Sequence, residues 1–187
     1  TITGVATSIT AFIGRAKRGP VNKAETIHNF GDYERLFGGL DLNSSMSYAV
    51  RDFFLNGGSQ AVIVRLFHAD TAAEADPAKT SLTVGNVAME AANEGAWGVH
   101  LRAETDLKVS ADVAANLGLA ASDLFNLTVR DAGSGATEKY LNLSFKESAR
   151  RVDRVLAAQS QLVRWKGTYP GTAPTPAADK EIGRAHV

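Results

Sequence analysis

The chain has 187 residues, 44% of them hydrophobic and 21% charged, which is ordinary for a globular protein and long enough for one medium domain or two small ones. Its 20 Lys and Arg residues balance its 20 Asp and Glu residues, so the charge gives no indication of a polyanionic partner such as nucleic acid. The absence of cysteine excludes a disulfide framework, a thiolate zinc site and a cysteine nucleophile, and it fits synthesis in a reducing cytoplasm.

The first part of the chain, residues 1–69, predicts the N-terminal portion of an α/β core. Ser8–Gly14 is a short apolar run rich in β-formers and indicates a largely buried strand, which Gly19-Pro20 then interrupts. Asn29 is placed to cap a short helix that carries aromatic residues on one face, and Gly38-Gly39 is placed to end it.

A second helix is predicted after Asn43-Ser44-Ser45, which supplies another N-cap. Five apolar residues recur at the spacing of one helix face, namely Met46, Ala49, Val50, Phe53 and Phe54. Gly57-Gly58 should end this helix, because glycine enters the left-handed cap conformation at little cost. Gln60–Phe67 follows as a buried strand. The order strand, helix, helix, strand leaves room for a crossover and therefore predicts a parallel pair of strands.

The second part, residues 81–166, predicts a smaller, β-rich α+β domain inserted after a linker at residues 70–80. A glycine-rich hairpin is expected at Asp131–Gly135. The expected strands are Ser81–Val84, Val99–Thr105, Phe125–Arg130 and Lys139–Leu143. Ser148–Ala158 is amphipathic and predicts a helix, and Leu162–Trp165 is a candidate final strand. The whole chain is therefore expected to be an α+β protein.

The end of the chain predicts little structure of its own. Residues 167–180 are rich in Gly, Thr, Pro and Ala and are expected to form a linker. Residues 181–187, EIGRAHV, match one reading frame of a common sequencing adapter, so we expect an artefact of an interrupted reading frame rather than a natural Ala-rich tail. No apolar run approaches the roughly 20 residues of a spanning helix and no signal segment opens the chain, so we expect a soluble protein without direct membrane binding.

No catalytic, cofactor-binding or metal-binding residues are predicted. The histidines His28, His68, His100 and His186 stand in no nucleophile or metal-ligand motif, and the HExxH, GxSxG and DxDxDG patterns are missing. The basic cluster Gly14–Pro20 has glycines at the spacing of a phosphate-binding loop. However, a proline without an N–H stands where that loop needs a lysine. We expect an exposed basic turn there, able to pair with acidic residues of a neighbouring copy.

Two further motifs are interpreted as structural. Glu94–Gly98 places a tryptophan between glycines, which favours packing of the ring at a tight turn over a ligand-binding loop. Acceptor patterns for N-glycosylation begin at Asn43, Asn126 and Asn142, but two of them lie in predicted strands and no secretion signal is present, so we interpret them as chance matches.

The order of these segments resembles that of phage-type contractile tail sheath proteins. Thr3–Pro20 is similar to the opening of that family's conserved core, and Thr26–Leu40 to its aromatic helix ending in glycine. Ser47–Arg65 (SYAVRDFFLNGGSQAVIVR) resembles the family's YAV-x-x-FF-x-NGG helix and following strand, which is the most specific likeness in the chain. Glu90–Arg102 resembles its GAWG-x-x-LR segment and Phe125–Leu143 its FNL-x-V strand and hairpin.

This resemblance implies a structural subunit with no catalysis and no cofactor. Sheath subunits stack in six-fold rings into a helical homopolymer around an inner tube, and the stack contracts to drive the tube through a target envelope. The implied partners are other sheath subunits, the inner tail tube protein, and the baseplate and tail terminator proteins, with no nucleic acid. The implied location is a virion tail or a contractile injection particle, such as one derived from a prophage, assembled in the bacterial cytoplasm.

On this resemblance the chain is the front of the sheath core, without the polymerising arms and the C-terminal part of the core. The subtilisin-like label of some family members describes a domain fold and implies no protease activity. Two alternatives remain open. One is a hydrolase on a doubly wound sheet, which would need a nucleophile and a base brought together. The other is a monomeric binding module whose second part holds sugar or protein on a virion surface.

Overall fold

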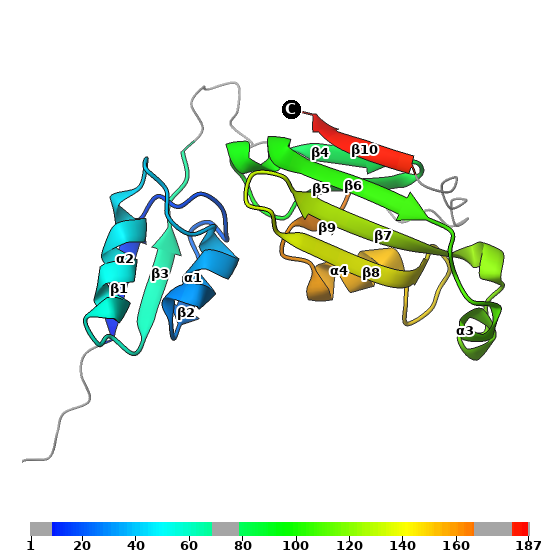
Figure 1. Cartoon of the computed structure of the whole chain (residues 1–187), viewed down its shortest axis with the longest axis horizontal. Coiled ribbons are helices and arrows are strands. Elements are labelled where there is room, and N and C mark those ends of the chain that lie inside the picture. Colours follow the sequence, from blue (N-terminus) through cyan, green and yellow to red (C-terminus); the bar gives the residue numbers. More distant parts are fainter. Residues whose placement is uncertain (1–8, 69–78, 167–180, 187) are drawn as a thin grey trace, which may run out of the picture. The chain divides into compact units, whose positions relative to one another are not determined.

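The computed structural model describes residues 9–68 and 79–166, and the backbone of residues 181–186. The chain divides into two compact units, Thr1–Ala75 and Asp76–Val187, each with its own hydrophobic core (Figure 1). Both units mix helices with sheet, which confirms the predicted α+β class. The predicted linkers at residues 70–80 and 167–180 fall almost entirely outside the described residues.

The first unit is a three-stranded sheet with two helices on one face (Figure 1). Its elements in chain order are β1 (Thr10–Gly14), β2 (Ala24–Ile27), α1 (Phe30–Phe37), α2 (Ser45–Leu55) and β3 (Ala61–Arg65). The strands stand in the order β1-β3-β2. β1 and β3 run parallel, with Thr10 opposite Ala61, which confirms the predicted parallel pair. β2 was not expected, because this antiparallel edge strand is only four residues long and buries only Ile27.

α1 begins and ends at the predicted capping residues. Oδ1 of Asn29 accepts the Asp32 N–H at 2.8 Å, and the Asp32 carboxylate accepts the His28 N–H at 3.0 Å. That backbone bond, together with the Arg35 guanidinium, holds the pKa of Asp32 below its usual value, so the carboxylate stays charged beside the helix N-terminus. Gly38 ends the helix in the left-handed conformation, with φ at 89°.

α2 buries fewer of its apolar residues than their spacing predicts. Met46 and Val50 are buried, whereas Phe53 and Phe54 are half-buried and Ala49 is exposed. The rings of Phe53 and Phe54 instead contact each other edge to face at the margin of the core. The buried core of this unit consists of Ile27, Tyr33, Phe37, Met46, Val50, Ala61 and Ile63.

The second unit is a seven-stranded antiparallel sheet in the order β8-β7-β6-β10-β4-β5-β9. The strands are β4 (Ser81–Val84), β5 (Val87–Ala91), β6 (Leu101–Asp106), β7 (Leu124–Asp131), β8 (Thr137–Ser144), β9 (Val163–Trp165) and β10 (Glu181–His186). The helical segments are η2 (Ala96–His100), α3 (Ala111–Asn116), η3 (Ala121–Asp123) and α4 (Val152–Gln159), of which η2 and η3 are 3-10 turns. The four strands, the final strand and the last helix that the sequence predicts are therefore present, with boundaries shifted by a few residues.

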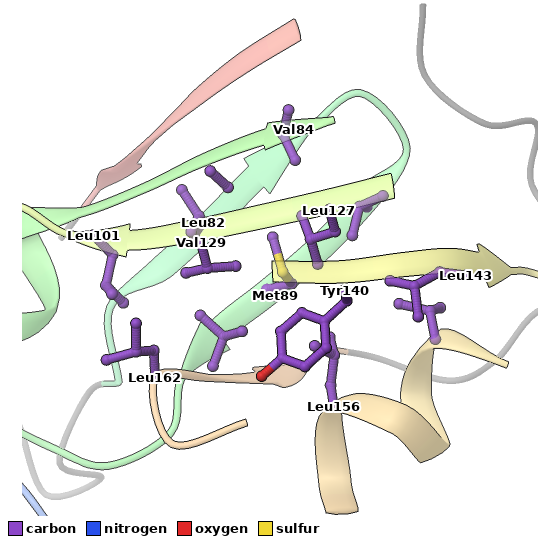
Figure 2. Close-up of a cluster of buried hydrophobic side chains, with 14 of the residues drawn as sticks. Leu82, Val84, Met89, Leu101, Leu127, Val129, Tyr140, Leu143, Leu156 and Leu162 are labelled. Carbon is purple, nitrogen blue, oxygen red and sulfur yellow. The ribbon is translucent and has the colours of Figure 1, made fainter. Parts of the chain in front are cut away.

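The core of the second unit lies between one face of the sheet and α4. Figure 2 shows Met89 of β5 and Leu127 of β7 in a cluster with Leu156 of α4. β5 and β6 alternate buried and half-buried residues, which is the pattern of an antiparallel sheet with one face in the core and one in water. None of the helices in the described part of the chain is long and apolar enough to cross a membrane.

Residues 181–186 form β10, which pairs antiparallel with both β6 and β4. Strand pairing does not bear on the nucleotide origin of these residues. The assignment of residues 181–187 to a sequencing adapter therefore stays a prediction.

Candidate functional site

The described histidines lie in three separate places. The backbone N–H of His28 takes part in the α1 cap, and its ring is exposed. His68 follows β3 and is also exposed. The exposed ring of His100 lies beside the hairpin at Gly133, and the side chain of His186 is outside the described residues. Within the described ranges, no three His, Asp or Glu side chains gather as a group able to hold a metal ion.

The basic cluster after β1 is only in part the exposed turn that the sequence predicts, because Arg15 is exposed and Lys17 half-buried while the third basic residue is buried. Arg18 is only 6% exposed, and its guanidinium donates to the Arg35 carbonyl at 3.0 Å, near the C-terminus of α1. Arg65 reaches into the same loop and donates to the Ala16 and Gly19 carbonyls at 3.0 and 2.7 Å. A phosphate-binding loop would point its N–H groups at a ligand. Here the loop carbonyls converge on arginine side chains, so the cluster is a packing element of the first unit.

Glycine at position 19 serves the same packing. Its φ is 106°, and a Cβ there would lie 2.7 Å from the Phe37 ring. The glycine spacing that resembles a phosphate loop is therefore explained by the close approach of this turn to α1.

The Trp97 segment is structural, as predicted. Trp97 is buried in η2 and belongs to the core of the second unit. A Cβ at Gly98 would stand 2.5 Å from the Thr80 hydroxyl, and Gly95 has a φ of 124°. The two glycines thus let the chain fold tightly enough to bring the indole ring inside.

The polar cluster around Glu138 joins β8 to the segment after α4. The Glu138 carboxylate accepts hydrogen bonds from the Tyr140 hydroxyl at 2.8 Å, the Ser160 hydroxyl at 2.7 Å and the Gln161 N–H at 2.8 Å. Burial, together with this carboxylate, raises the pKa of Tyr140. Ser160 Oγ also accepts the Val163 N–H at 2.9 Å. The sequence could not indicate this cluster, because its members are 22 residues apart and lie on different elements.

A serine beside a carboxylate is also the beginning of a nucleophilic site, so the cluster has to be weighed as one. Ser160 is buried, and its hydroxyl proton points to a carboxylate that already holds two other donors. Its lone pairs face the backbone N–H groups of Leu162 and Val163. A hydroxyl oxygen in this position is not accessible to a substrate. The cluster therefore connects β8 to the segment after α4 through hydrogen bonds.

Asn126, the first residue of one glycosylation pattern, is likewise committed inside the second unit. Its Nδ2 donates to Asp106 at 2.7 Å, and its Oδ1 accepts the Asn142 N–H at 3.0 Å, beside the irregular pairing of β7 and β8. Partial burial acts to raise the pKa of Asp106. The hydrogen bonds from Asn126 and the Lys108 N–H outweigh it and hold that pKa below its usual value. A buried, fully bonded amide is no acceptor for a glycan.

The comparisons with known proteins bear on the fold. No protein-family model matches the chain, and no curated protein matches its sequence. Among solved structures, a sheath tail protein from Listeria innocua matches 99% of this chain with a TM-score of 0.61 at 16% identity. The two share a fold. A sheath tail protein from Desulfitobacterium hafniense matches 99% of the chain with a TM-score of 0.49 at 14% identity.

The likeness to the Listeria protein supports the sheath-like fold that the sequence motifs predict. The chain spans about a third of the length of the two solved structures, 35% and 36%. A structural likeness at such low sequence identity shows a shared fold and leaves the role of the chain to be argued from its own residues.

Proposed function

We propose that this chain is part of a structural subunit of a contractile tail sheath. The subunit polymerises around an inner tube and contracts to drive that tube through a target envelope, without catalysis. The observation that carries the proposal is the agreement of the fold with the order of the sequence motifs. The fold agrees with the Listeria sheath tail protein over 99% of the chain, and the sheath-like motifs occur in the family's order along the same residues.

The most specific motif corresponds to one continuous piece of structure. The YAV and FF residues lie on α2, the NGG residues end it, and the following apolar run is β3. Gly57 takes a φ of 91° at the helix end. A Cβ at Gly58 would stand within 2.5 Å of the Phe53 ring. The motif is therefore required by the local packing of a helix turning into the central strand, which supports its use as a mark of this fold.

The arrangement of polar groups supports a structural role as well. Arg18, Arg65, Glu138 and Asn126 each hold separate elements together, and the hydrogen bonds that they make run within the protein. The proposed partners follow from the sheath resemblance and are other sheath subunits in six-fold rings, the inner tube protein, and the baseplate and terminator proteins. The proposed location is a virion tail or a related injection particle.

Electron microscopy of the full-length polypeptide that contains this chain tests the proposal. Expressed alone and concentrated, it is expected to form hollow cylinders of uniform diameter. The 187-residue chain is the matched control. It is expected to form no cylinders, because it spans only about a third of the sheath structures that it matches. A full-length polypeptide that remains monomeric at every concentration and salt condition would refute the sheath role and favour a binding module.

A further inference from the structure

One face of the three-stranded sheet in the first unit is apolar, and none of the described residues of that unit forms a layer on it. The strand register places Ala11 beside Val62 and Ile13 beside Val64, and it places Thr26 and Ala24 on the other side of the same two valines. Side chains two residues apart on a strand share a face. The face, called the open face below, therefore consists of Ile9, Ala11, Ile13, Ala24, Thr26, Val62, Val64 and Leu66.

The open face carries no charged residue, and much of it is exposed. Ile9 is 56% exposed, Ile13 66% and Leu66 46%, although all three are aliphatic. Both helices lie on the opposite face (Figure 1). Ile63 belongs to the core on that face, and Phe12 packs against it. Single exposed aliphatic residues are normal, but a continuous apolar sheet face indicates a contact surface.

The residue pattern of β3 indicates what kind of layer packs on this face. β3 is the central strand, and both its inward and outward positions are apolar as far as Arg65. It pairs in parallel with β1 and antiparallel with β2, and a continuous apolar run in a central strand is the pattern of a strand buried on both faces. β5 and β6 in the second unit show the contrasting pattern, in which half-buried positions with charged side chains alternate with buried ones. The sheet of the first unit thus has the pattern of the middle layer of three, and the described residues of that unit form two of these layers.

The open face has the size of a contact with one helix. Three strands about 4.8 Å apart and about five residues long, at about 3.3 Å per residue, cover roughly 14 by 17 Å, or about 240 Å². A stable contact between separate molecules buries about 800 Å² on each partner, so the face is too small to hold a second copy by itself. A helix about 10 Å in diameter covers most of the open face. A helix of the same polypeptide can bind with less than about 800 Å² of buried surface, because the covalent link raises its effective concentration.

We propose that the open face is the docking surface for an amphipathic α-helix of the same polypeptide, from a segment outside residues 1–187. The matched sheath structures are about three times as long as this chain, so the fold accommodates further segments. The helix completes an α/β/α sandwich around β3, with aliphatic residues at helical spacing facing Ile13 and Val64. This inference rests on the sheet and on the length of the matched fold, and it does not depend on contraction or assembly as a sheath.

Residues 1–187 contain no cysteine, so an introduced thiol is the only one in this chain, and any cysteine in the rest of the full-length polypeptide is first replaced by serine. Ile13→Cys and Ala11→Cys place a thiol on the open face. Leu55→Cys is the matched control, because Leu55 is 74% exposed at the end of α2, on the other side of the sheet. Each variant is made in the 187-residue chain and in the full-length polypeptide, and the native proteins react with a thiol reagent at dilutions where no assembly forms.

In the 187-residue chain, all three thiols are expected to react at rates close to that of a free thiol. In the full-length polypeptide, the thiols at positions 11 and 13 should react at least about a hundredfold more slowly, while position 55 stays fast. The use of two positions guards against a variant that fails to fold, because either one alone reports the face. Hydrogen exchange in the full-length polypeptide should identify one protected helix that loses protection when Ile13 is replaced by Asp.

Three results would overturn the inference. Equal, fast labelling in both proteins would mean that the face stays open. Slow labelling at positions 11 and 13 already in the 187-residue chain, independent of concentration, would assign the face to the chain's own second unit. Protection that increases with concentration would assign it to a second copy. Slow labelling in a full-length polypeptide that forms no cylinders would support the docked helix while refuting the sheath role.

Discussion

Glu138 offers a direct test of what holds the second unit together. Glu138→Ala removes the acceptor of three hydrogen bonds of 2.7–2.8 Å and leaves the hydroxyls of Tyr140 and Ser160 without this partner. Hydrogen bonds to charged groups contribute about 1.5–3 kcal/mol each, and a buried group left unpaired costs about 1–3 kcal/mol. The three bonds share one carboxylate, so their contributions overlap. We expect the free energy of unfolding to fall by about 3–5 kcal/mol.

Urea unfolding followed by tryptophan fluorescence measures this change in the intact chain. Both tryptophans, Trp97 and Trp165, lie in the second unit, so the signal reports that unit selectively. Glu147→Ala is the control, because the Glu147 carboxylate is 66% exposed and pairs with Arg151 and Arg154, and ion pairs of an exposed carboxylate contribute about 0–1 kcal/mol. In a Tyr140→Phe background the cost of Glu138→Ala should fall by at least about 1 kcal/mol. A loss at Glu138 no larger than that at Glu147 would refute the reasoning.

Three predictions concern the first unit. Tyr33→Phe should leave the first unit equally stable or up to about 1 kcal/mol more stable, because the buried hydroxyl finds no hydrogen-bond partner in the described residues. Hydrogen exchange of β3 measures this free energy, and a loss above about 1 kcal/mol would contradict the prediction. Burial raises the pKa of Tyr33 from 10.0 to about 12, so stability present below pH 10 should fall by about 2–3 kcal/mol as the pH rises to 12. Alkaline unfolding followed by circular dichroism should show this component in the wild type and not in Tyr33→Phe. Asn29→Ala removes the N-cap of α1 and should cost about 1 kcal/mol in the same exchange measurement, whereas Asn29→Ser should restore most of it.

The parts of the fold that sequence could predict are those governed by neighbouring residues. Asn29 and Gly38 act within one turn of α1, so their chemistry marks its ends directly. β2 and β5 were missed for the opposite reason. The segments AETI and VAMEA carry Glu and Ala, which disfavour strands in isolation, and they become strands because their neighbours in the sheet offer hydrogen bonds and burial.

The same limit applies to the polar residues. The basic cluster after β1 suggested an exposed turn because charges are usually solvated, yet Arg18 and Arg65 turn inward where loop and helix carbonyls need donors. Whether an arginine has such carbonyls nearby depends on residues 17 to 49 positions away. The Glu138 cluster could not be predicted from the sequence either, because its residues lie far apart in the chain. The absence of a nucleophile or metal motif, by contrast, could be stated from the sequence, since it needs only residue identity and spacing.

The two units bury their sheets in different ways, and this difference indicates which contacts a larger assembly would keep and which it would change. β5 and β6 place their half-buried positions in water, so the outer face of the second unit has charged side chains and can form and break contacts at small cost. The open face of the first unit is aliphatic, and its burial stabilises by about 25 cal/mol per Å², so about 240 Å² contributes about 6 kcal/mol. If the subunit switches between two packings, as the proposed sheath function requires, a contact of that strength should stay closed in both states. We therefore expect the thiol at position 13 to remain protected before and after contraction, and labelling of the outer strand face of the second unit to differ between the two states.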